Sequence, residues 1–424
     1  MATERLPNRW VIAGAAVIMQ VCLGSYYSWS VFVKPLMTSE AWTLTQVSAA
    51  FTIAVVCLGI GSAIGGRWQV RTSAQVVGTT AGLFYGGGFL IAALAVANHS
   101  LWLLYAGYGL VGGLGMGMGY ICPVPPITKW FPDKRGLMTG AAVMGFGGGA
   151  LIMSPIAARL VQSRGVPVTL LGFGITWVIV IPLVVRLFKD PPPGWVPEGW
   201  QPVTRVAKAA TTRDYVPAEA VKTWRFWLLG AMLSLNSAAG IMILSQASPL
   251  AQQQTGLGVV AAGTVVGIIA IFNAGGRMFW PWVSDTIGRA QVFFLLFAIQ
   301  VGLFFALPSL HRPLLFTIGV CAIALCYGGG YGLMPSMTAD FFGPKYVGGI
   351  FGWILLGWGF VAGPAPLLIA YVRQTTGTYE YAIYAIGFVM LFSLIFPVLA
   401  RREALRIAAH EEAQRAAASV PSAA

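Results

Sequence analysis

The sequence predicts an all-α membrane protein with twelve transmembrane helices arranged in two six-helix halves. Of its 424 residues, 57% are hydrophobic and only 9% are charged, whereas a soluble domain carries about 25% charged residues. The apolar residues form blocks of about 20, which is long enough to cross a hydrocarbon core about 30 Å thick. A transmembrane β-barrel would instead show alternating segments of about ten residues. One proline-rich polar stretch divides the apolar blocks into six and six.

The apolar blocks place the spans in order along the chain. The first block is too long for the apolar part of a signal peptide and has no small-residue cleavage site, so we expect a spanning helix there. The predicted spans are 10–33, 45–65, 74–97, 101–127, 136–161, 167–187, 224–250, 258–282, 290–309, 313–338, 347–371 and 380–400.

A polar stretch between the sixth and seventh spans sets the domain limits. It reads KDPPPGWVPEGWQP and then TRVAKAATTRD, and its prolines and scattered charges predict a linker. The predicted parts are an N-terminal half, 1–187, a cytoplasmic linker, 188–223, a C-terminal half, 224–400, and a cytoplasmic tail, 401–424. We expect the tail to form a short helix that frays.

The positive charges predict the topology. With both termini inside, 20 of the 26 Lys and Arg residues fall in inner segments, five in outer segments and one within a span. The positive-inside rule therefore predicts a multi-pass protein of the inner (plasma) membrane with cytoplasmic termini. The net charge of +13 then has a topological cause, so we expect no nucleic-acid partner. The five cysteines lie in apolar runs without metal-ligand spacing, which predicts small buried residues and no metal or cofactor.

The one basic residue within a span is Arg277, in the stretch IFNAGGRMFWPWV. No acidic residue or histidine lies well inside a span. A buried arginine costs about 2.5–3.5 kcal/mol at the centre of a membrane helix and cannot lose its proton. It can snorkel to the cytoplasmic end of its span, bond helix carbonyls as a structural residue, or face a central cavity and bind an anion. The third interpretation is favoured because a planar guanidinium matches a carboxylate. Asn273, one turn earlier on the same face, can orient the guanidinium or the ligand.

Spans 4 and 10 contain related sequences. One reads GLGMGMGYICPVPPITKWFPDKRG and the other CYGGGYGLMPSMTADFFGPKYVGG. Matching positions in two parallel halves, with a site between them near the midplane, are typical of secondary transporters. Tyrosine hydroxyls can complete such a polar pocket, although close packing also explains tyrosine and glycine here. The candidates are Tyr26 and Tyr27 in span 1, Tyr120 in span 4, and Tyr327 and Tyr331 in span 10, with Tyr120 and Tyr331 favoured.

Several motifs resemble the major facilitator superfamily, and more narrowly the monocarboxylate transporter group and its oxalate/formate antiporter relatives. The KWFPDKRGLMTG and VSDTIGR stretches are specific together, and the second resembles the superfamily's motif between spans 8 and 9. Its counterpart after span 2, GGRWQVRTS, lacks the aspartate. The other stretches are NRW at 8–10, YSW at 27–29, TWRFW at 223–227, NAGGRMFWPW at 273–282 and GGYGLMPSMTADFFG at 329–343.

The resemblance implies a major facilitator fold in which Arg277 binds the substrate carboxylate and Tyr27, Tyr120 and Tyr331 line the site. Oxalate carriers of this type have a lysine in span 11, whose place is taken here, by spacing, by Trp358. A lone arginine would leave one charge of a dianion unpaired, which favours a monocarboxylate such as lactate, pyruvate, acetate or propionate. Animal-type monocarboxylate carriers have an aspartate where this chain has Asn273, so the usual proton acceptor is absent.

The resulting hypothesis is a secondary active transporter that moves a small monocarboxylate anion with a proton across the lipid bilayer by alternating access, functioning as a monomer. A carboxylate/carboxylate (oxalate/formate-like) anion exchanger is the alternative. A sensor or channel-like permease is an alternative from another class of protein. An enzyme is not expected, because the spans contain no Ser-His arrangement, metal cluster or carboxylate pair.

Overall fold

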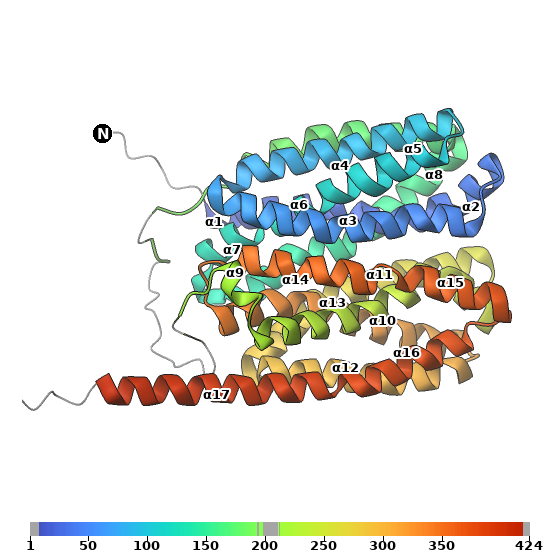
Figure 1. Ribbon diagram of the computed structural model, residues 1–424. Coiled ribbons are helices and arrows are strands. Elements are labelled where there is room, and N and C mark those ends of the chain that lie inside the picture. Colours follow the sequence, from blue (N-terminus) through green and yellow to red (C-terminus); the bar gives the residue numbers. More distant parts are fainter. Residues whose placement is uncertain (1–7, 193–194, 198–210, 212, 419–424) are drawn as a thin grey trace, which may run out of the picture.

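The computed structural model describes residues 8–192, 195–197, 211 and 213–418, and all regular secondary structure in them is helical. The helices run roughly side by side in one bundle (Figure 1). In the first half they are α1 (Arg9–Gly24), η1 (Ser25–Ser28), α2 (Trp29–Glu40), α3 (Leu44–Arg71), α4 (Ala74–Ala97), α5 (Leu101–Leu104), η2 (Tyr105–Gly112), α6 (Gly113–Ile121), α7 (Val124–Trp130), η3 (Pro132–Lys134) and α8 (Arg135–Val185). In the remainder they are α9 (Pro217–Ala220), α10 (Trp224–Thr255), α11 (Val259–Ile287), α12 (Arg289–Ala306), η4 (Leu307–Ser309), α13 (Pro313–Phe342), α14 (Val347–Ala362), α15 (Ala365–Thr376), α16 (Glu380–Ser393) and α17 (Ile395–Ala418).

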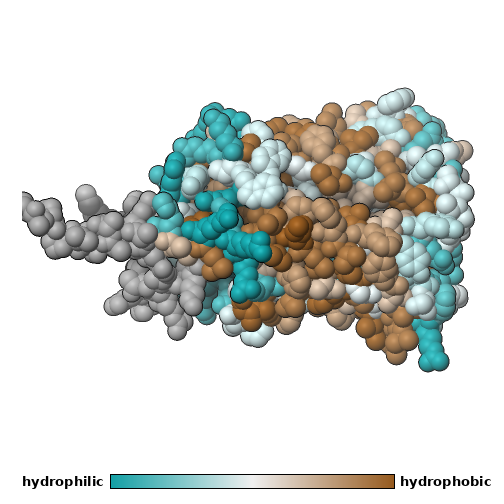
Figure 2. Space-filling model, turned by 60° about the horizontal axis from the view of Figure 1, so that its bottom comes forward, coloured by the Kyte–Doolittle hydropathy of each residue, from teal (hydrophilic) through white to brown (hydrophobic). Residues whose placement is uncertain are grey.

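These helices make twelve membrane crossings, as the sequence predicts. Among the described residues, ten helices are long and apolar enough to cross a membrane. One of them, Leu137–Val185, has 49 residues and crosses twice, because the chain turns at Gly165, whose φ of 81° is in the left-handed region that glycine tolerates. Helix α11, with 29 residues, provides the twelfth crossing. Figure 2 shows hydrophobic residues over the middle of the bundle and hydrophilic residues gathered toward its two ends, as a lipid environment requires.

Several crossings are broken at glycine or proline. The fourth crossing breaks between α6 and α7 at Pro123, and the eleventh breaks between α14 and α15 at Gly363 and Pro364. Proline removes a backbone donor and interrupts a helix. The carbonyl of Cys122, whose helical donor would be residue 126, a proline, instead accepts a hydrogen bond from Gln69 Nε2 at 2.9 Å. Side chains thus replace the lost backbone bonds inside the membrane.

The linker and the tail are only partly described. Residues 193–194, 198–210, 212 and 419–424 lie outside the described residues, and they include most of the TRVAKAATTRD stretch. Within the predicted linker, Pro217–Ala220 forms the short helix α9. The tail was expected to form only a short helix, but α17 continues through it to Ala418. Its alanine, glutamate and arginine residues are strong helix formers.

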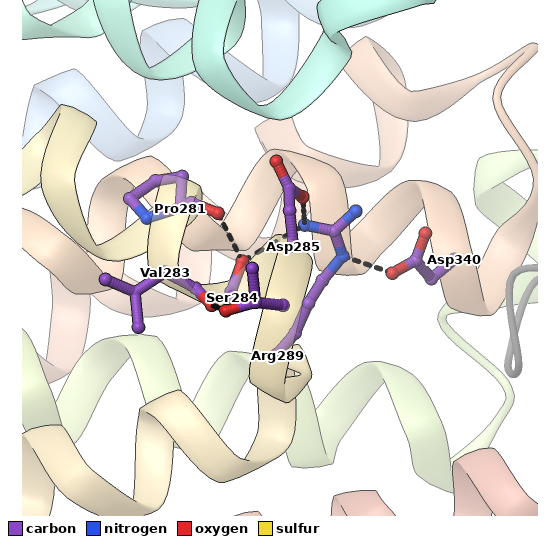
Figure 3. A network of polar contacts seen from close by, with 7 residues as sticks. Pro281, Val283, Ser284, Asp285, Arg289 and Asp340 are labelled. Carbon is purple, nitrogen blue, oxygen red and sulfur yellow. Dashed lines mark hydrogen bonds and ion pairs between the residues drawn. The ribbon is translucent and has the colours of Figure 1, made fainter.

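Figure 3 shows a polar network at the end of the bundle where α11 meets α12. Arg289 forms ion pairs with Asp340 of α13 and, at 3.5 Å, with Asp285 of α11. Arg289 Nη1 also donates to Ser284 Oγ at 3.4 Å. The network ties the α11–α12 turn to α13, within the region that resembles the superfamily motif.

The two halves touch most extensively where α3 packs on α14 and α8 packs on α11, and they also touch where α8 meets α13. Glycine permits the close approach. A Cβ atom at Gly66 of α3 would lie 2.7 Å from the carbonyl oxygen of Gly348, and a Cβ atom at Gly140 of α8 would lie 2.4 Å from that of Arg277. Small residues at membrane helix interfaces maximise contact between backbones. The halves therefore meet directly beside Arg277.

Adjacent glycines in α11 provide a test of this packing. A Cβ atom at Gly276 would lie 2.1 Å from the Leu325 carbonyl oxygen of α13, whereas one at Gly275 would have nothing within 4 Å. We expect Gly276→Ala to lower stability by about 1–3 kcal/mol through overpacking, seen as a lower Tm in detergent. Gly275→Ala is the matched control and should leave Tm unchanged or slightly raised. Equal Tm values for the two variants would contradict the close α11–α13 contact.

Candidate functional site

The candidate site is built around Arg277 of α11, which has 0% solvent exposure. The residue lies ten positions before the end of α11 at Ile287, or about 15 Å along the axis. Its side chain extends toward the N-terminal end of its helix, as helical side chains do, and so away from the nearer end of the bundle. Arg277 Nη1 donates to the Val143 carbonyl at 3.2 Å and to Tyr120 Oη at 3.5 Å. The guanidinium is enclosed between the halves and does not snorkel to the end of its span.

The charge of Arg277 has no carboxylate partner among the described residues. Its guanidinium carbon lies 4.9 Å from the ring centroid of Tyr331 and 5.4 Å from that of Phe146, so aromatic faces supply part of the compensation. Its Nε donates to Asn273 Oδ1 at 3.5 Å. Nη2 is buried and has no hydrogen-bond partner in the described part of the chain. Nη2 of the guanidinium is therefore available to donate to an anion.

The tyrosines on the two halves meet around this charge. Tyr27 Oη and Tyr327 Oη are 2.9 Å apart, which joins η1 of the first half to α13 of the second. The rings of Tyr120 and Tyr331 lie 6.4 Å apart, edge to face. The ring of Trp358 lies 5.9 Å from that of Tyr331. Within the described residues, the Tyr331 hydroxyl and the Trp358 Nε1 group are buried without a hydrogen-bond partner.

A small cavity lies between these side chains. The centre of a water molecule can occupy about 10 Å³ of this cavity, so the cavity holds about one water molecule. A substrate with several heavy atoms therefore needs the halves to separate before it can enter. The cavity is lined by Tyr26, Tyr27, Val55, Leu58, Tyr120, Phe146, Ile241, Tyr331, Leu355 and Trp358.

Of the eight residues that the sequence suggested, five line this cavity: Tyr26, Tyr27, Tyr120, Tyr331 and Trp358. The other three adjoin them, since Arg277 contacts Tyr120, Asn273 contacts Arg277, and Tyr327 contacts Tyr27. The Tyr26 hydroxyl is already engaged, because it donates to the Phe51 carbonyl at 2.7 Å. Tyr26 also stacks on Phe51, with ring centroids 4.4 Å apart. Sequence reasoning missed the Val143 carbonyl, because backbone acceptors have no sequence signal. It expected an apolar wall but did not name its aliphatic members, Val55, Leu58, Ile241 and Leu355, because these residue types equally suit lipid contact.

The contrast between Tyr331 and Tyr26 gives a prediction. Removing the unpartnered hydroxyl of Tyr331 by Tyr331→Phe should leave Tm unchanged, while substrate affinity falls by about tenfold through loss of one hydrogen bond to a charged ligand. Tyr26→Phe is the matched control. It should cost about 1 kcal/mol of stability through the lost bond to Phe51 and leave KM unchanged. A similar KM for Tyr331→Phe and the wild-type protein would remove Tyr331 from the site.

Comparisons with known proteins assign the family. The Major Facilitator Superfamily sequence profile matches residues 14–335. The chain is 29% identical to the oxalate:formate antiporter of Oxalobacter formigenes over 353 residues, covering 81% of this chain and 80% of that protein. It is 22% identical to monocarboxylate transporter 12-B of Danio rerio over 428 residues, covering 92% and 86%.

A solved structure has the same fold. The major facilitator transporter FucP, in its outward conformation, superposes with a TM-score of 0.64 at 13% identity, covering 91% of this chain and 98% of that one. Together with the profile match over most of the chain, this confirms the fold class and the resemblance seen in the motifs. The chain belongs to the major facilitator superfamily of membrane transporters.

Proposed function

We propose that this chain is a secondary active transporter that moves a small monocarboxylate, such as lactate or pyruvate, together with a proton. The observation that carries the proposal is the buried guanidinium of Arg277, which lacks a carboxylate partner among the described residues and has an unbonded Nη2. A substrate carboxylate supplies both the missing charge and the missing acceptor, in a geometry that guanidinium favours. Similarity to an oxalate:formate antiporter and to a monocarboxylate transporter supports a carboxylate substrate.

A single carboxylate suits the charge of the site. Trp358, a neutral residue, lines the cavity beside Tyr331. In the described part of the chain, Arg277 is the one basic residue that forms a hydrogen bond or a cation–π contact with the residues lining the cavity. A dicarboxylate would bring one negative charge without a cation to meet it, which is costly in a dry site. The aromatic and aliphatic wall then sets the size of the group attached to the carboxylate.

The proposed transport cycle is alternating access. Residues 1–187 and 224–400 are the two units that rock against each other, joined by the linker 188–223. The α3–α14 and α8–α11 contacts are the surfaces about which they would move. Bound substrate neutralises Arg277, so the closed state is favoured when the carrier is loaded. Because the cavity is formed within one chain, we propose that the monomer is the functional unit.

We propose that the protein lies in the inner (plasma) membrane with both termini in the cytoplasm. Helix α1 begins and α17 ends at the same end of the bundle (Figure 1). Basic residues gather at this end, where Arg9 pairs with Asp133 at 2.9 Å and Arg225 with Glu403 at 2.9 Å. The positive-inside rule places such an end in the cytoplasm.

The proposed proton coupling does not use an acidic side chain beside Arg277. Asn273 contacts Arg277 Nε where an acidic residue would accept a proton, so the proton travels on the substrate or on a transient acid in the Arg277 pocket. The rival function is a carboxylate/carboxylate exchanger, which the 29% identity to the oxalate:formate antiporter favours.

Uptake of labelled L-lactate into proteoliposomes tests the two functions. For a symporter, we expect an inward proton gradient to drive accumulation without internal carboxylate. For an exchanger, we expect uptake that ignores the gradient and rises with internal oxalate or formate. Counterflow with preloaded unlabelled lactate separates both from a channel, which does not show it. Uptake of no carboxylate under either condition would refute the proposed substrate class.

A further inference from the structure

A second small cavity lies between the halves, where α13 ends and α14 begins. Three hydroxyl-bearing side chains line it: Thr128 of α7, Thr139 of α8 and Ser336 of α13. The rest of its wall is apolar and includes Val347 of α14. The centre of a water molecule can occupy about 10 Å³ of it, so this cavity also holds about one water molecule. None of the side chains lining it is acidic or basic.

The second cavity lies between Arg277 and the nearer end of the bundle. Cβ atoms at Gly140 and Gly332 would each come within 2.4 Å of the Arg277 carbonyl oxygen, from α8 and α13 respectively. Thr139 precedes Gly140 in α8 and is therefore one residue closer to that end of the bundle. Ser336 follows Gly332 in α13 by one helical turn and is also closer to that end. The guanidinium points the other way, toward Val143 and Tyr120. A ligand leaving Arg277 for this end of the bundle would therefore pass between Thr139 and Ser336.

The hydroxyls of Thr139 and Ser336 are buried and have no hydrogen-bond partner in the described part of the chain. Thr139 is 0% exposed and Ser336 is 2% exposed. Serine and threonine inside helices usually donate to a carbonyl of the preceding turn. Thr128 does so to Pro125 at 2.9 Å, and Thr338 does so to Met334 at 2.8 Å. The hydroxyls of Thr139 and Ser336 are therefore free to donate hydrogen bonds to a ligand or water molecule that enters the cavity.

The beginning of α14 adds a preference for negative charge. This helix has 16 residues, and no side chain caps its first turn. Val347, its first residue, lines the cavity. The first backbone N–H groups of a helix have no partner within it, and the helix dipole favours an anion there. Two residues with unpartnered hydroxyls and the first residue of an uncapped helix thus line one small space, and none of the side chains lining it is acidic.

From this geometry we propose that the cavity is a second station for the substrate carboxylate on its path between Arg277 and the bundle end that carries the termini. The inference rests on the proposed carboxylate substrate. The hydroxyls of Thr139 and Ser336 donate hydrogen bonds to the carboxylate as it separates from the guanidinium, so the charge is never without donors along the path. The station widens when α8 and α13, which belong to different halves, move apart. It affects the rate of passage and leaves the affinity at Arg277 unchanged.

The test compares rate with affinity in the double variant Thr139→Val, Ser336→Ala. We expect lactate counterflow in proteoliposomes to slow by about tenfold or more, because hydrogen bonds to a charged group are lost on the path. Lactate affinity, measured by quenching of tryptophan fluorescence in detergent, should change by less than about twofold. Tm should stay equal or rise, because the lost hydroxyls had no partners. The hydroxyl-swapped variant Thr139→Ser, Ser336→Thr should retain most of the wild-type rate.

Thr338→Val is the matched control, since it removes a buried hydroxyl two residues from Ser336 that already bonds its own helix. Its counterflow rate should stay close to wild type. A full rate in the double variant, or an equal loss in Thr338→Val, would overturn the station while leaving the proposed function intact. If the double variant loses only proton-driven uptake and keeps the full counterflow rate, the hydroxyls bind water and not the substrate carboxylate. That result would also overturn the station. If the wild-type protein moves no carboxylate, the proposed function itself fails.

Discussion

Replacing Arg277 with alanine is expected to lower the rate of L-lactate uptake by at least about a hundredfold. A guanidinium–carboxylate pair forms two charged hydrogen bonds, each contributing about 1.5–3 kcal/mol, and about 1.4 kcal/mol corresponds to a tenfold change. Alanine removes both bonds, and a buried substrate charge is then left without a partner. The measurement is initial uptake into proteoliposomes under the same proton gradient that drives the wild-type protein.

Stability separates a binding role from a structural one for Arg277. In the described structure its guanidinium forms three long hydrogen bonds, at 3.2 to 3.5 Å, and leaves Nη2 unpartnered. Removing an incompletely paired buried charge should therefore leave Tm unchanged or raise it. Arg277→Lys keeps the charge but loses the planar fork, so its activity should lie between alanine and wild type. Arg373→Ala is the control: Arg373 is half-buried and bonded to Gln253, so its loss should change uptake by less than about twofold.

Two outcomes would contradict this account of Arg277. Full uptake by Arg277→Ala would mean that the arginine serves the α8–α11 contact and not the substrate. A large fall in the Tm of Arg277→Ala with a proportional loss of uptake would also indicate a structural role. Either result would leave the family assignment untouched, since that depends on the whole chain.

The fold could be predicted further than the site, for physical reasons. Apolar blocks must match the thickness of a bilayer, so their lengths alone placed twelve crossings. Arg277 was evident because a charge inside a span is costly and needs a cause. The direction of the Tyr26 hydroxyl was not evident, because it depends on the nearby Phe51 carbonyl in another helix. Thr139 and Ser336 escaped notice because hydroxyls in helices usually bond their own backbone.

The substitution Trp358→Lys is expected to shift the preference of the carrier from monocarboxylates to dicarboxylates. Trp358 lines the central cavity, and its ring contacts that of Tyr331, which in turn lies against the Arg277 guanidinium. A lysine there would place a second cation in the same cavity. The empty site would then hold two buried positive charges, which only a dianion can neutralise fully. We expect the ratio of oxalate to lactate uptake to rise by at least about tenfold.

Trp358→Met is the matched control for this change, because methionine has about the length of lysine without its charge. It enlarges the cavity equally, so it should alter lactate KM without giving oxalate uptake. If both variants transport oxalate equally, the ring of Trp358 excludes dicarboxylates by size and the charge argument is wrong. If neither variant transports oxalate while both still transport lactate, a cation at position 358 is not placed to bind the second carboxylate of oxalate. Oxalate uptake by the lysine variant alone would establish that the number of cations in this cavity sets the number of carboxylates it accepts.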